Sequence, residues 1–343
     1  MTIRLKDIAE KVGVRASTVS DILNERSTCY VSAELKDRVL LVARELNYLP
    51  NFIAKSLRRK NTATIGLIMA HFGEEVNTAK IKDIENLAWE SGFHVYIGHT
   101  EGDAKREEAY IDDFLSRQVD GLIFVHPTSL EDGRCIRELI KKNFPLVIIS
   151  TGQEEDVNYV AVDRRYGAYL AVEHLLKLGH RDIVFLCTNF PDHPFVKQRI
   201  AGYKDALAKF GVDFNEKLIY YDAFDYATGY ERANDVLNER NIPTAIFAAN
   251  DEVAIGAMRR LQNEGLNVPE DVSIVGFDDI KGAEFSHPPL TTVRQPTGEV
   301  GKKALEILLE KIKNPQSCEL EQVIFKPELI VRKSTAKAKT FAQ

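Results

Sequence analysis

The amino-acid sequence predicts an α/β protein in which a small all-α head precedes a two-lobed α/β body with parallel sheets. The net charge changes sign along the chain: residues 1–60 hold 12 Lys and Arg against 7 Asp and Glu, a net of +5. The whole chain is −6, so residues 61–343 carry −11. The head has only short helical patterns, whereas apolar runs and amphipathic helices alternate from Thr64 onward. A basic head on an acidic body indicates that the head meets a polyanion.

Composition limits the classes of protein to which this chain can belong. Its 343 residues, 44% of them apolar, suffice for roughly two to three domains. The four cysteines are far apart and form no C-x-x-C pair, so we expect no metal site and a reducing compartment. Charges interrupt the N-terminus too often for a signal peptide, and the longest apolar runs are too short to span a membrane. We therefore expect a cytoplasmic protein without a membrane partner.

Three helices are predicted in the head. The first covers Leu5–Val12 and is followed by Gly13, which can take the positive φ of a sharp turn. The second covers about 17–24, and the third runs over about 32–46 with Ser32 as its N-cap. The residues expected in the core are Leu5, Ile8, Ala9, Val12, Val19, Ile22, Leu23, Val39, Leu40, Ala43 and Leu46. This pattern is typical of a helix-turn-helix, and a purely structural three-helix bundle is the alternative.

The second helix and the segment after the third carry the polar residues that could contact DNA. The second helix leaves four polar residues facing outward, namely Ser17, Thr18, Ser20 and Asp21. A recognition helix places such residues at base edges in the major groove. Residues 50–60 begin with Pro, continue for about two helical turns and end in three cations. So short a helix is marginal alone, so it would order against a second copy or DNA, or else serve as a charged linker.

The head resembles the lactose-repressor (LacI) family of bacterial transcription regulators. The motifs that carry the resemblance are Lys-Asp-Ile-Ala-Glu-Lys-Val-Gly-Val at 6–14, Ser-Thr-Val-Ser at 17–20, Leu-Asn-Tyr-Leu-Pro-Asn at 46–51 and Ala-Lys-Ser-Leu-Arg at 54–58. The resemblance implies that residues 50–58 form a hinge helix that enters the minor groove, with Leu57 as its apolar wedge. The DNA-binding residues that it implies, together with the outward face, are Lys6, Arg15, Ala16, Ser17, Thr18, Ser20, Asp21, Asn24, Tyr48, Asn51, Ala54, Lys55, Leu57 and Arg58.

Two positions of the head depart from the family pattern. Arg15 stands where the family often has a helix-capping Ser, and it brings a cation to the positive end of a helix dipole. Asp21 stands where the family often has a base-reading Arg. Because a carboxylate can only accept hydrogen bonds, for instance from cytosine N4, we expect an operator unlike the commonest one of the family. Alternatively, Asp21 faces solvent or pairs with Arg15.

The body is predicted as two sheets from its alternation of strands and helices. The first series of strands covers 64–70, 94–97, 121–125 and 145–149, with helices near 78–91, 104–117 and 130–142. The second series covers 159–162, 183–187, 219–221, 245–248 and 273–277. Ligands of open α/β sheets bind at the carboxyl ends of the strands, so two facing sheets would form an interlobe cleft.

The body resembles the effector domain of the same family, which is similar to periplasmic binding proteins. The longest matching stretch is Val-Pro-Glu-Asp-Val-Ser-Ile-Val-Gly-Phe-Asp-Asp at 268–279. The resemblance implies interleaved lobes, with chain crossings near residues 160, 290 and 323. The predicted division is a head at 1–49, a hinge at 50–60, and an effector and dimerisation domain at 61–343, in which lobe 1 is about 61–160 plus 291–322, lobe 2 is about 161–290 plus 323–333, and 334–343 is a tail.

The resemblance also implies the effector-binding residues of the body. The predicted set is His71, Arg199, Phe224, Asn250 and Asp278, for which the alternatives are a turn role for Asp278 and core packing for Phe224. The loop 71–77 departs from the family, because its aromatic pair is replaced and two acids, Glu74 and Glu75, are added. An effector with a cationic or differently shaped group, loss of effector binding, and control by a protein partner all remain open.

Enzymatic function is not indicated. None of the 20 glycines lies two positions from another, so the G-x-G-x-x-G motif is absent, and G-x-x-x-x-G-K-[ST] is absent too. No histidine has a nucleophile or metal-ligand spacing beside it, so we expect no catalytic residues. A transport receptor would share the fold of the body but would have no use for residues 1–60. We expect a dimeric repressor that binds a palindromic operator on double-stranded DNA, responds to a carbohydrate effector, needs no cofactor, and lacks a tetramer-forming tail.

Overall fold

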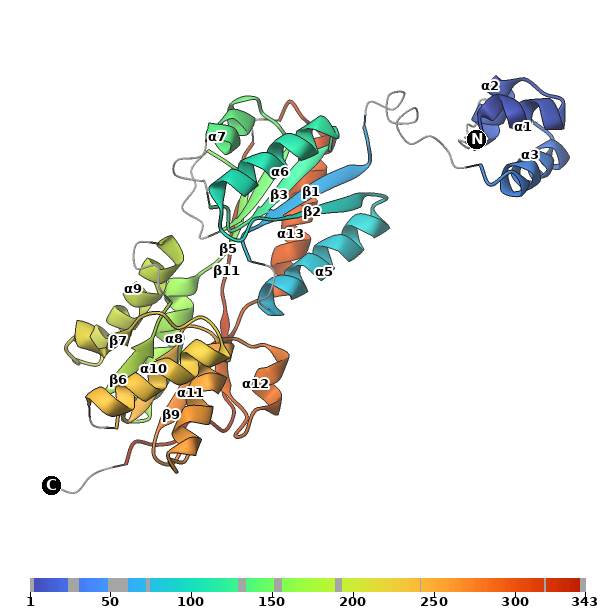
Figure 1. Ribbon diagram of the computed structural model, residues 1–343. Coiled ribbons are helices and arrows are strands. Elements are labelled where there is room, and N and C mark those ends of the chain that lie inside the picture. Colours follow the sequence, from blue (N-terminus) through green and yellow to red (C-terminus); the bar gives the residue numbers. More distant parts are fainter. Residues whose placement is uncertain are drawn as a thin grey trace. The chain divides into compact units, whose positions relative to one another are not determined.

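The computed structural model describes residues 3–23, 31–48, 61–71, 75–128, 134–150, 156–188, 193–240, 242–317 and 319–339. The chain divides into two compact units, Met1–Thr62 and Ala63–Gln343, which are described separately below. Figure 1 shows the helices of the first unit and the two sheets of the second.

The first unit contains the three predicted helices, which are α1 (Leu5–Val12), α2 (Ala16–Leu23) and α3 (Ala33–Glu45). Gly13 ends α1 at φ 79°, and its N–H donates to the Ala9 carbonyl. The Ser32 hydroxyl caps α3 by accepting a hydrogen bond from the Leu35 N–H. The buried core residues of this unit are Ile8, Ala9, Val12, Val19, Ile22, Val39, Val42 and Ala43. The helix-turn-helix prediction is therefore confirmed, although Val42 joins the core where Leu40 was expected.

The first sheet of the second unit is parallel throughout, in the order β11-β5-β4-β3-β1-β2. Its strands are β1 (Thr64–Met69), β2 (His94–His99), β3 (Gly121–Val125), β4 (Leu146–Ser150), β5 (Tyr159–Val162) and β11 (Gln322–Phe325). Helices α5 (Glu75–Glu90) and α13 (Thr297–Lys313) pack on one face. Helices α6 (Ala104–Ser116) and α7 (Arg134–Lys141) pack on the other, so the strands are buried on both sides.

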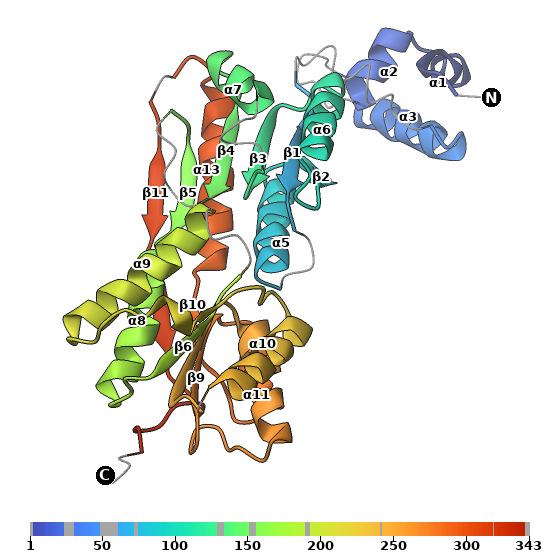
Figure 2. The same cartoon turned by 60° about the vertical axis from the view of Figure 1, so that its left-hand side comes forward.

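The second sheet has the order β12-β10-β9-β8-β6-β7, with only β12 antiparallel among the described strands. Its strands are β6 (Ile183–Leu186), β7 (Ile219–Tyr220), β8 (Ala245–Ala248), β9 (Ser273–Asp278), β10 (Thr291–Arg294) and β12 (Glu328–Ile330). Helices α8 (Arg164–Lys177) and α9 (Pro194–Lys209) cover one face. Helices α10 (Tyr226–Glu239) and α11 (Asp251–Asn263) cover the other, as Figure 2 shows, and the short α12 (Lys281–Phe285) follows β9.

The chain crosses between the two lobes three times, a few residues later than predicted. Strand β5 was expected to open the second series, but it pairs with β4 in the first sheet. Residues 291–294 were expected in lobe 1, but they form β10 of the second sheet, and 323–325 lie in β11 of the first. The crossings therefore follow β5, β10 and β11. A short apolar run shows that a strand exists, but only its pairing partner decides to which sheet the strand belongs.

The predicted tail is part of the second lobe as far as residue 339. The Ser334 side chain is buried, donates to the Ile274 carbonyl at 2.6 Å and accepts from the Thr291 N–H at 2.8 Å. Further along, the Ala338 N–H donates to the Leu178 carbonyl. Residues 334–339 of the predicted tail therefore pair with the second lobe through these hydrogen bonds.

Candidate functional site

The start of α2 presents a polar surface on the head. Lys6, Arg15, Ala16 and Ser17 are exposed, whereas Thr18, Asp21 and Tyr48 are half-buried. The Arg15 carbonyl accepts a hydrogen bond from the Val19 N–H, which places Arg15 directly before the first turn of α2. These accessible residues at the N-terminal end of a second helix have the arrangement with which a helix-turn-helix reads base edges.

Ser20 does not belong to this surface. It was predicted to face outward, but it is only 5% exposed. Helix α2 packs against both α1 and α3, so the buried arc is wider than the single apolar stripe formed by Val19 and Ile22. A small hydroxyl fits at the flank of such an arc when it has a hydrogen-bond partner. The remaining predicted DNA contacts, namely Asn24, Asn51, Ala54, Lys55, Leu57 and Arg58, lie outside the described residues, as does the predicted hinge helix.

A cavity of about 360 Å³ lies between the two lobes of the second unit. All five residues predicted from the sequence line it, namely His71, Arg199, Phe224, Asn250 and Asp278. His71, Asn250 and Asp278 stand at or just after the carboxyl ends of β1, β8 and β9. Parallel strands bring their carboxyl ends to one edge of each sheet, so residues far apart in the sequence converge there.

Asn250 and Phe224 form one side of the cavity. The Asn250 side chain caps α11, because its Oδ1 accepts from the Val253 N–H at 2.8 Å. Its Nδ2 donates to the Phe224 carbonyl at 2.8 Å, which ties the Phe224 backbone to the start of α11. The Phe224 side chain is 39% exposed, so it offers a ring surface to the cavity instead of filling the core.

Asp278 connects the cavity to a crossing segment. It ends β9 with φ 116°, a left-handed conformation. Its Oδ1 accepts a hydrogen bond from the Nε2 of Gln295 at 2.5 Å. Gln295 follows β10, where the chain passes from the second lobe to the first, and it also lines the cavity. A ligand that contacts Asp278 would therefore also affect this crossing.

Arg199 is held in place by aromatic rings. Its guanidinium lies 4.6 Å from the centroid of the Phe277 ring and 5.7 Å from that of Phe195. Arg199 is only 8% exposed, and among the described residues its Nε has no hydrogen-bond partner. Cation–π contacts of this kind fix the plane of a guanidinium while leaving its edge available to an acceptor.

Five further charged or titratable residues of the cavity were missed from the sequence, namely Lys80, Glu101, His126, Arg164 and His193. Lys80 is 1% exposed and donates to the Asn77 Oδ1. Arg164 is 5% exposed, donates to the Ser150 carbonyl at 3.0 Å and lies 3.2 Å from the Nε2 of His126. Burial, followed by the charges of Arg164 and Lys80, holds the pKa of His126 well below its ordinary value.

A weak sequence signal could have identified Lys80. It lies three residues after Asn77 and four before Ile84, both buried, so it occupies the inner face of α5. A cation at an inner position of an amphipathic helix indicates a buried polar site, whereas a lysine on the outer face would not. Arg164 carries no comparable signal, because it opens a helix directly after a strand.

Glu75, one of the two acids added to the loop 71–77, makes its described contact outside the cavity. Glu75 begins α5, and its Oε1 accepts a hydrogen bond from the Lys281 N–H at 2.9 Å. Glu75 is not among the residues that line the cavity, and Glu74 lies outside the described residues. The described part of this loop therefore gives no support to an effector with a cationic group.

The described residues form neither a metal site nor a membrane-spanning helix. There, no three His, Cys, Asp or Glu side chains are grouped so that they could hold a metal ion. Likewise, none of the helices in this part of the chain is both long and apolar enough to cross a lipid bilayer.

Comparison with known proteins assigns the chain to a family. Residues 4–51 match the family of bacterial regulatory proteins known as the lacI family, and residues 172–335 match the periplasmic binding protein-like domain. The chain is 33% identical to the HTH-type transcriptional repressor PurR of Vibrio campbellii, over 97% of this chain and 98% of that protein. It is 32% identical to the ribose operon repressor of Haemophilus influenzae, over 96% and 98%.

The fold agrees with these sequence matches. The structure of the lac repressor dimer bound to operator and the anti-inducer ONPF is similar with a TM-score of 0.87, at 28% identity, over 98% of this chain and 100% of that one. The matches cover both the helix-turn-helix head and the two-lobed body, as the resemblance predicted. The chain therefore belongs to the lacI family of bacterial regulatory proteins and is a DNA-binding transcription regulator.

Proposed function

We propose that the protein is a dimeric repressor whose binding to a palindromic operator is controlled by a small carbohydrate-like effector in the interlobe cavity. The observation that carries this proposal is the cavity itself, because residues of both lobes line it. A ligand that contacts both lobes has different affinities for different lobe arrangements. That difference is the only means by which an effector can shift the population of the DNA-binding state.

The lining favours a hydroxylated ligand of modest size. Asn250, Asp278 and Gln295 supply amide and carboxylate groups that exchange hydrogen bonds with hydroxyls, and Phe224 offers a ring face. A volume of about 360 Å³ is at the small end of ligand pockets, which suits a monosaccharide. One relative, the ribose operon repressor, is named for a sugar. We accordingly assign effector contacts to His71, Arg199, Phe224, Asn250 and Asp278.

On the DNA side, we assign base and backbone contacts to the accessible start of α2. Arg15, Ala16, Ser17, Thr18 and Asp21 provide that surface, and Lys6 and Tyr48 flank it. The segment 50–60 is proposed as the hinge helix on its sequence pattern, with Leu57 as the wedge. We retain the division into a head at 1–49, a hinge at 50–60 and a body from 61, with the lobe boundaries moved to the crossings described above.

A second copy of the chain would cover exposed apolar side chains on neighbouring elements of the body. Trp89 of α5 is 66% exposed, and Phe285 of α12 is 82% exposed. The hydrogen bond from Lys281 to Glu75 brings the starts of these two helices together. Trp89 lies near the C-terminal end of α5, so the two side chains form separate contacts and not one patch. Exposed large apolar side chains mark interaction surfaces, and a similar structure is a dimer, so we propose α5 and α12 as elements of the dimer interface.

The relatives are transcriptional repressors, and we propose that this chain likewise catalyses no reaction, needs no cofactor and acts in the cytoplasm. Its half-buried His126 supports a binding role, since the ring lies beside the guanidinium of Arg164 and not beside a nucleophile in the described contacts. Control by a protein partner, or repression without any effector, is the alternative that the following experiment separates.

The test measures DNA binding by fluorescence anisotropy, using a duplex with the inverted repeat upstream of the gene and a shuffled duplex. We expect tight binding to the first alone, a steep loss of affinity with salt, and a changed affinity in the presence of one sugar or sugar derivative. Ser17→Ala should reduce the discrimination, whereas the control Ser116→Ala in the body should not. Equal binding to both duplexes would contradict sequence-specific regulation, and indifference to every sugar would favour the alternative.

A further inference from the structure

We propose that the effector is anionic: a hydroxylated carbon skeleton that carries a carboxylate or a phosphate, bound by Lys80, Arg164 and Arg199. This inference rests on the proposed control by a small molecule in the interlobe cavity, and it names the chemical class of that molecule. Four observations on the cavity support it.

The first observation is the burial of three cations around one space. Lys80 is 1% exposed, Arg164 is 5% exposed and Arg199 is 8% exposed, and all three line the same cavity. They come from α5, α8 and α9, so both lobes contribute. Removing a cation from water is costly unless an opposite charge or several hydrogen-bond acceptors replace the water. A cavity that gathers three such groups is prepared for an anion.

The second observation is the geometry of Arg199. Its guanidinium rests on Phe277 and Phe195, and within the described residues its Nε has no hydrogen-bond partner. A buried donor without an acceptor destabilises the empty cavity, and a ligand acceptor removes that cost. The planar fork of a guanidinium matches the two oxygens of a carboxylate or phosphate, and such charge-assisted pairs are stronger than bonds to a neutral hydroxyl.

The third observation is the set of cations around His126. After burial, the pKa of His126 is lowered mainly by the charges of Arg164 and Lys80. Burial and Arg164 also lower the pKa of His193. Both rings therefore stay neutral near pH 7 in a positive potential. A positive potential in a low-dielectric cavity attracts an anionic ligand.

The fourth observation concerns the acids nearby, whose described contacts lie elsewhere. Glu75 accepts from the Lys281 N–H. Glu101 does line the cavity, but its carboxylate pairs with Arg106 and its side chain is 61% exposed, so its charge is partly compensated and partly solvated. Asp278 accepts from Gln295 near Asn250 and Phe224. An anion would be repelled by Asp278, so the hydroxyl-bearing end of the ligand would face Asp278 and the charged end would face Lys80, Arg164 and Arg199.

The experiment compares ligands that differ only in charge, by calorimetry on the full chain without DNA. Each set contains a neutral sugar, its uronic acid, its aldonic acid and its terminal phosphate, for glucose, galactose, mannose, fructose and ribose where these exist. Inorganic phosphate is the control for an ion alone. We expect at least one acid or phosphate to bind about tenfold or more tightly than its neutral parent, since hydrogen bonds between charged groups are stronger than bonds to a neutral hydroxyl. The compound that binds most tightly shows whether the charged group of the effector is a carboxylate or a phosphate.

Variants then test the residues. Lys80→Gln and Arg164→Gln should each reduce the preference for the anion over its neutral parent by about tenfold. The matched controls are Lys82→Gln, an exposed neighbour, and Arg165→Gln, whose guanidinium pairs with Asp205. Both should keep the preference. If Arg164→Gln does not fold, Lys80→Gln decides the matter alone.

The outcomes separate this inference from the proposed function. If a neutral sugar binds as tightly as its acid and phosphate, the anionic assignment is overturned while control by a small molecule stands. If Lys80→Gln weakens neutral and anionic ligands equally, the assignment to these cations fails. If the protein binds its operator but none of these compounds, both the anionic assignment and control by a sugar fail. Only the proposal of DNA recognition then remains.

Discussion

The carboxylate of Glu75 accepts a hydrogen bond from the backbone N–H of Lys281 at 2.9 Å, and this bond joins the two lobes. Glu75 opens α5 of the first lobe and Lys281 opens α12 of the second, 206 positions apart in the sequence. The bond favours the lobe arrangement that encloses the cavity, and it does so without contacting the cavity. An exposed hydrogen bond of this kind contributes about 0.5–1.5 kcal/mol.

Glu75→Ala should therefore weaken effector binding by a factor of about 2–10, because the arrangement in which both lobes touch the ligand loses this energy. Glu75→Gln keeps an acceptor oxygen and should bind the effector nearly as the wild type does. Calorimetry measures both affinities. Equal affinities for all three proteins would show that the bond does not influence the lobe equilibrium.

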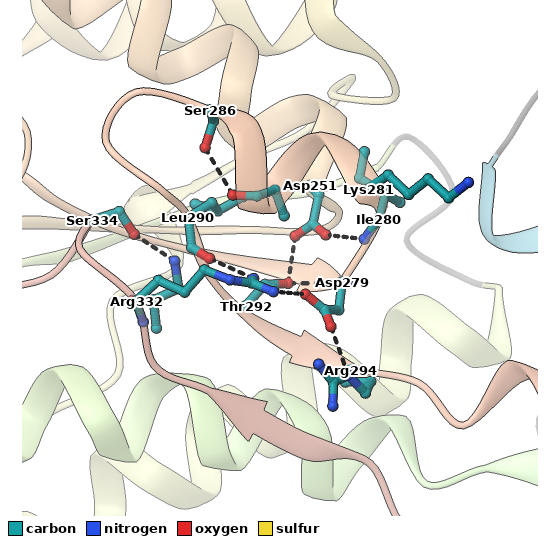
Figure 3. Close-up of polar contacts among 12 residues, drawn as sticks. Asp251, Asp279, Ile280, Lys281, Ser286, Leu290, Thr292, Arg294, Arg332 and Ser334 are labelled. Carbon is teal, nitrogen blue, oxygen red and sulfur yellow. Dashed lines mark hydrogen bonds and ion pairs between the residues drawn. The ribbon is translucent and has the colours of Figure 1, made fainter.

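A second set of contacts connects the loop after β9 to the ends of β10 and β12 (Figure 3). The Asp279 carboxylate accepts from the Nε of Arg294 at 2.6 Å and forms an ion pair with Arg332 at 2.7 Å. Arg294 ends β10, and Arg332 follows β12. Next to it, the buried Asp251 accepts hydrogen bonds from the Thr292 hydroxyl and the Ile280 N–H. Burial and the nearby charge of Asp278 raise the pKa of Asp251 well above its ordinary value.

Asp279→Asn should lower the free energy of unfolding by about 1–3 kcal/mol, because two guanidinium groups lose their shared charge. Asn suits the position, since residue 279 has a left-handed φ of 57° that Asn adopts readily. Urea unfolding measures the change. The control Asp205→Asn removes an exposed ion pair with Arg165 and should have a smaller effect. A larger loss in the control than in Asp279→Asn would contradict this account.

The neutral His126 makes stability depend on pH. Its pKa is lowered in the folded state by burial and by the charges of Arg164 and Lys80, whereas an unfolded histidine titrates near about 6.5. Below that pH the unfolded chain takes up a proton that the folded chain refuses. Stability should therefore be constant above about pH 6.5 and should fall as the pH decreases through the acid range.

Urea unfolding between about pH 5.5 and about pH 7.5 measures this slope. His126→Asn should flatten it, but not abolish it, because the pKa values of His174, His180 and His193 are also lowered, mainly by burial. An unchanged slope in the variant would mean that His126 is protonated in the folded protein, against the cation-rich environment described above.

Phe285→Glu should convert the dimer to a monomer and weaken operator binding, because it places a charge in the apolar surface that a second copy would cover. The control Phe214→Glu changes a 36% exposed ring of the second lobe that is not on α12. Sedimentation velocity measures the state of each variant. A dimeric Phe285→Glu protein would place the interface elsewhere.

The sequence determined the local structure and much of the site. Apolar spacing identified the three helices of the head, and Ser32 and Gly13 marked their ends because caps and turns depend on single residues. The alternation of strands and helices predicted parallel sheets, and the family resemblance led to His71, Asn250 and Asp278, which lie at or just after strand ends and line one cavity. Such features follow from neighbours in the chain and from a rule that applies to every parallel sheet.

The tertiary structure decided whatever depends on which distant segments meet. Ser20 is buried because α2 has two neighbours, and β5 belongs to the first sheet because β4 and β11 flank it. The same holds for Lys80 and Arg164, whose charges act together only because α5 and α8 converge on the cavity. Pairing and burial arise between residues that are remote along the chain, so no local periodicity contains them.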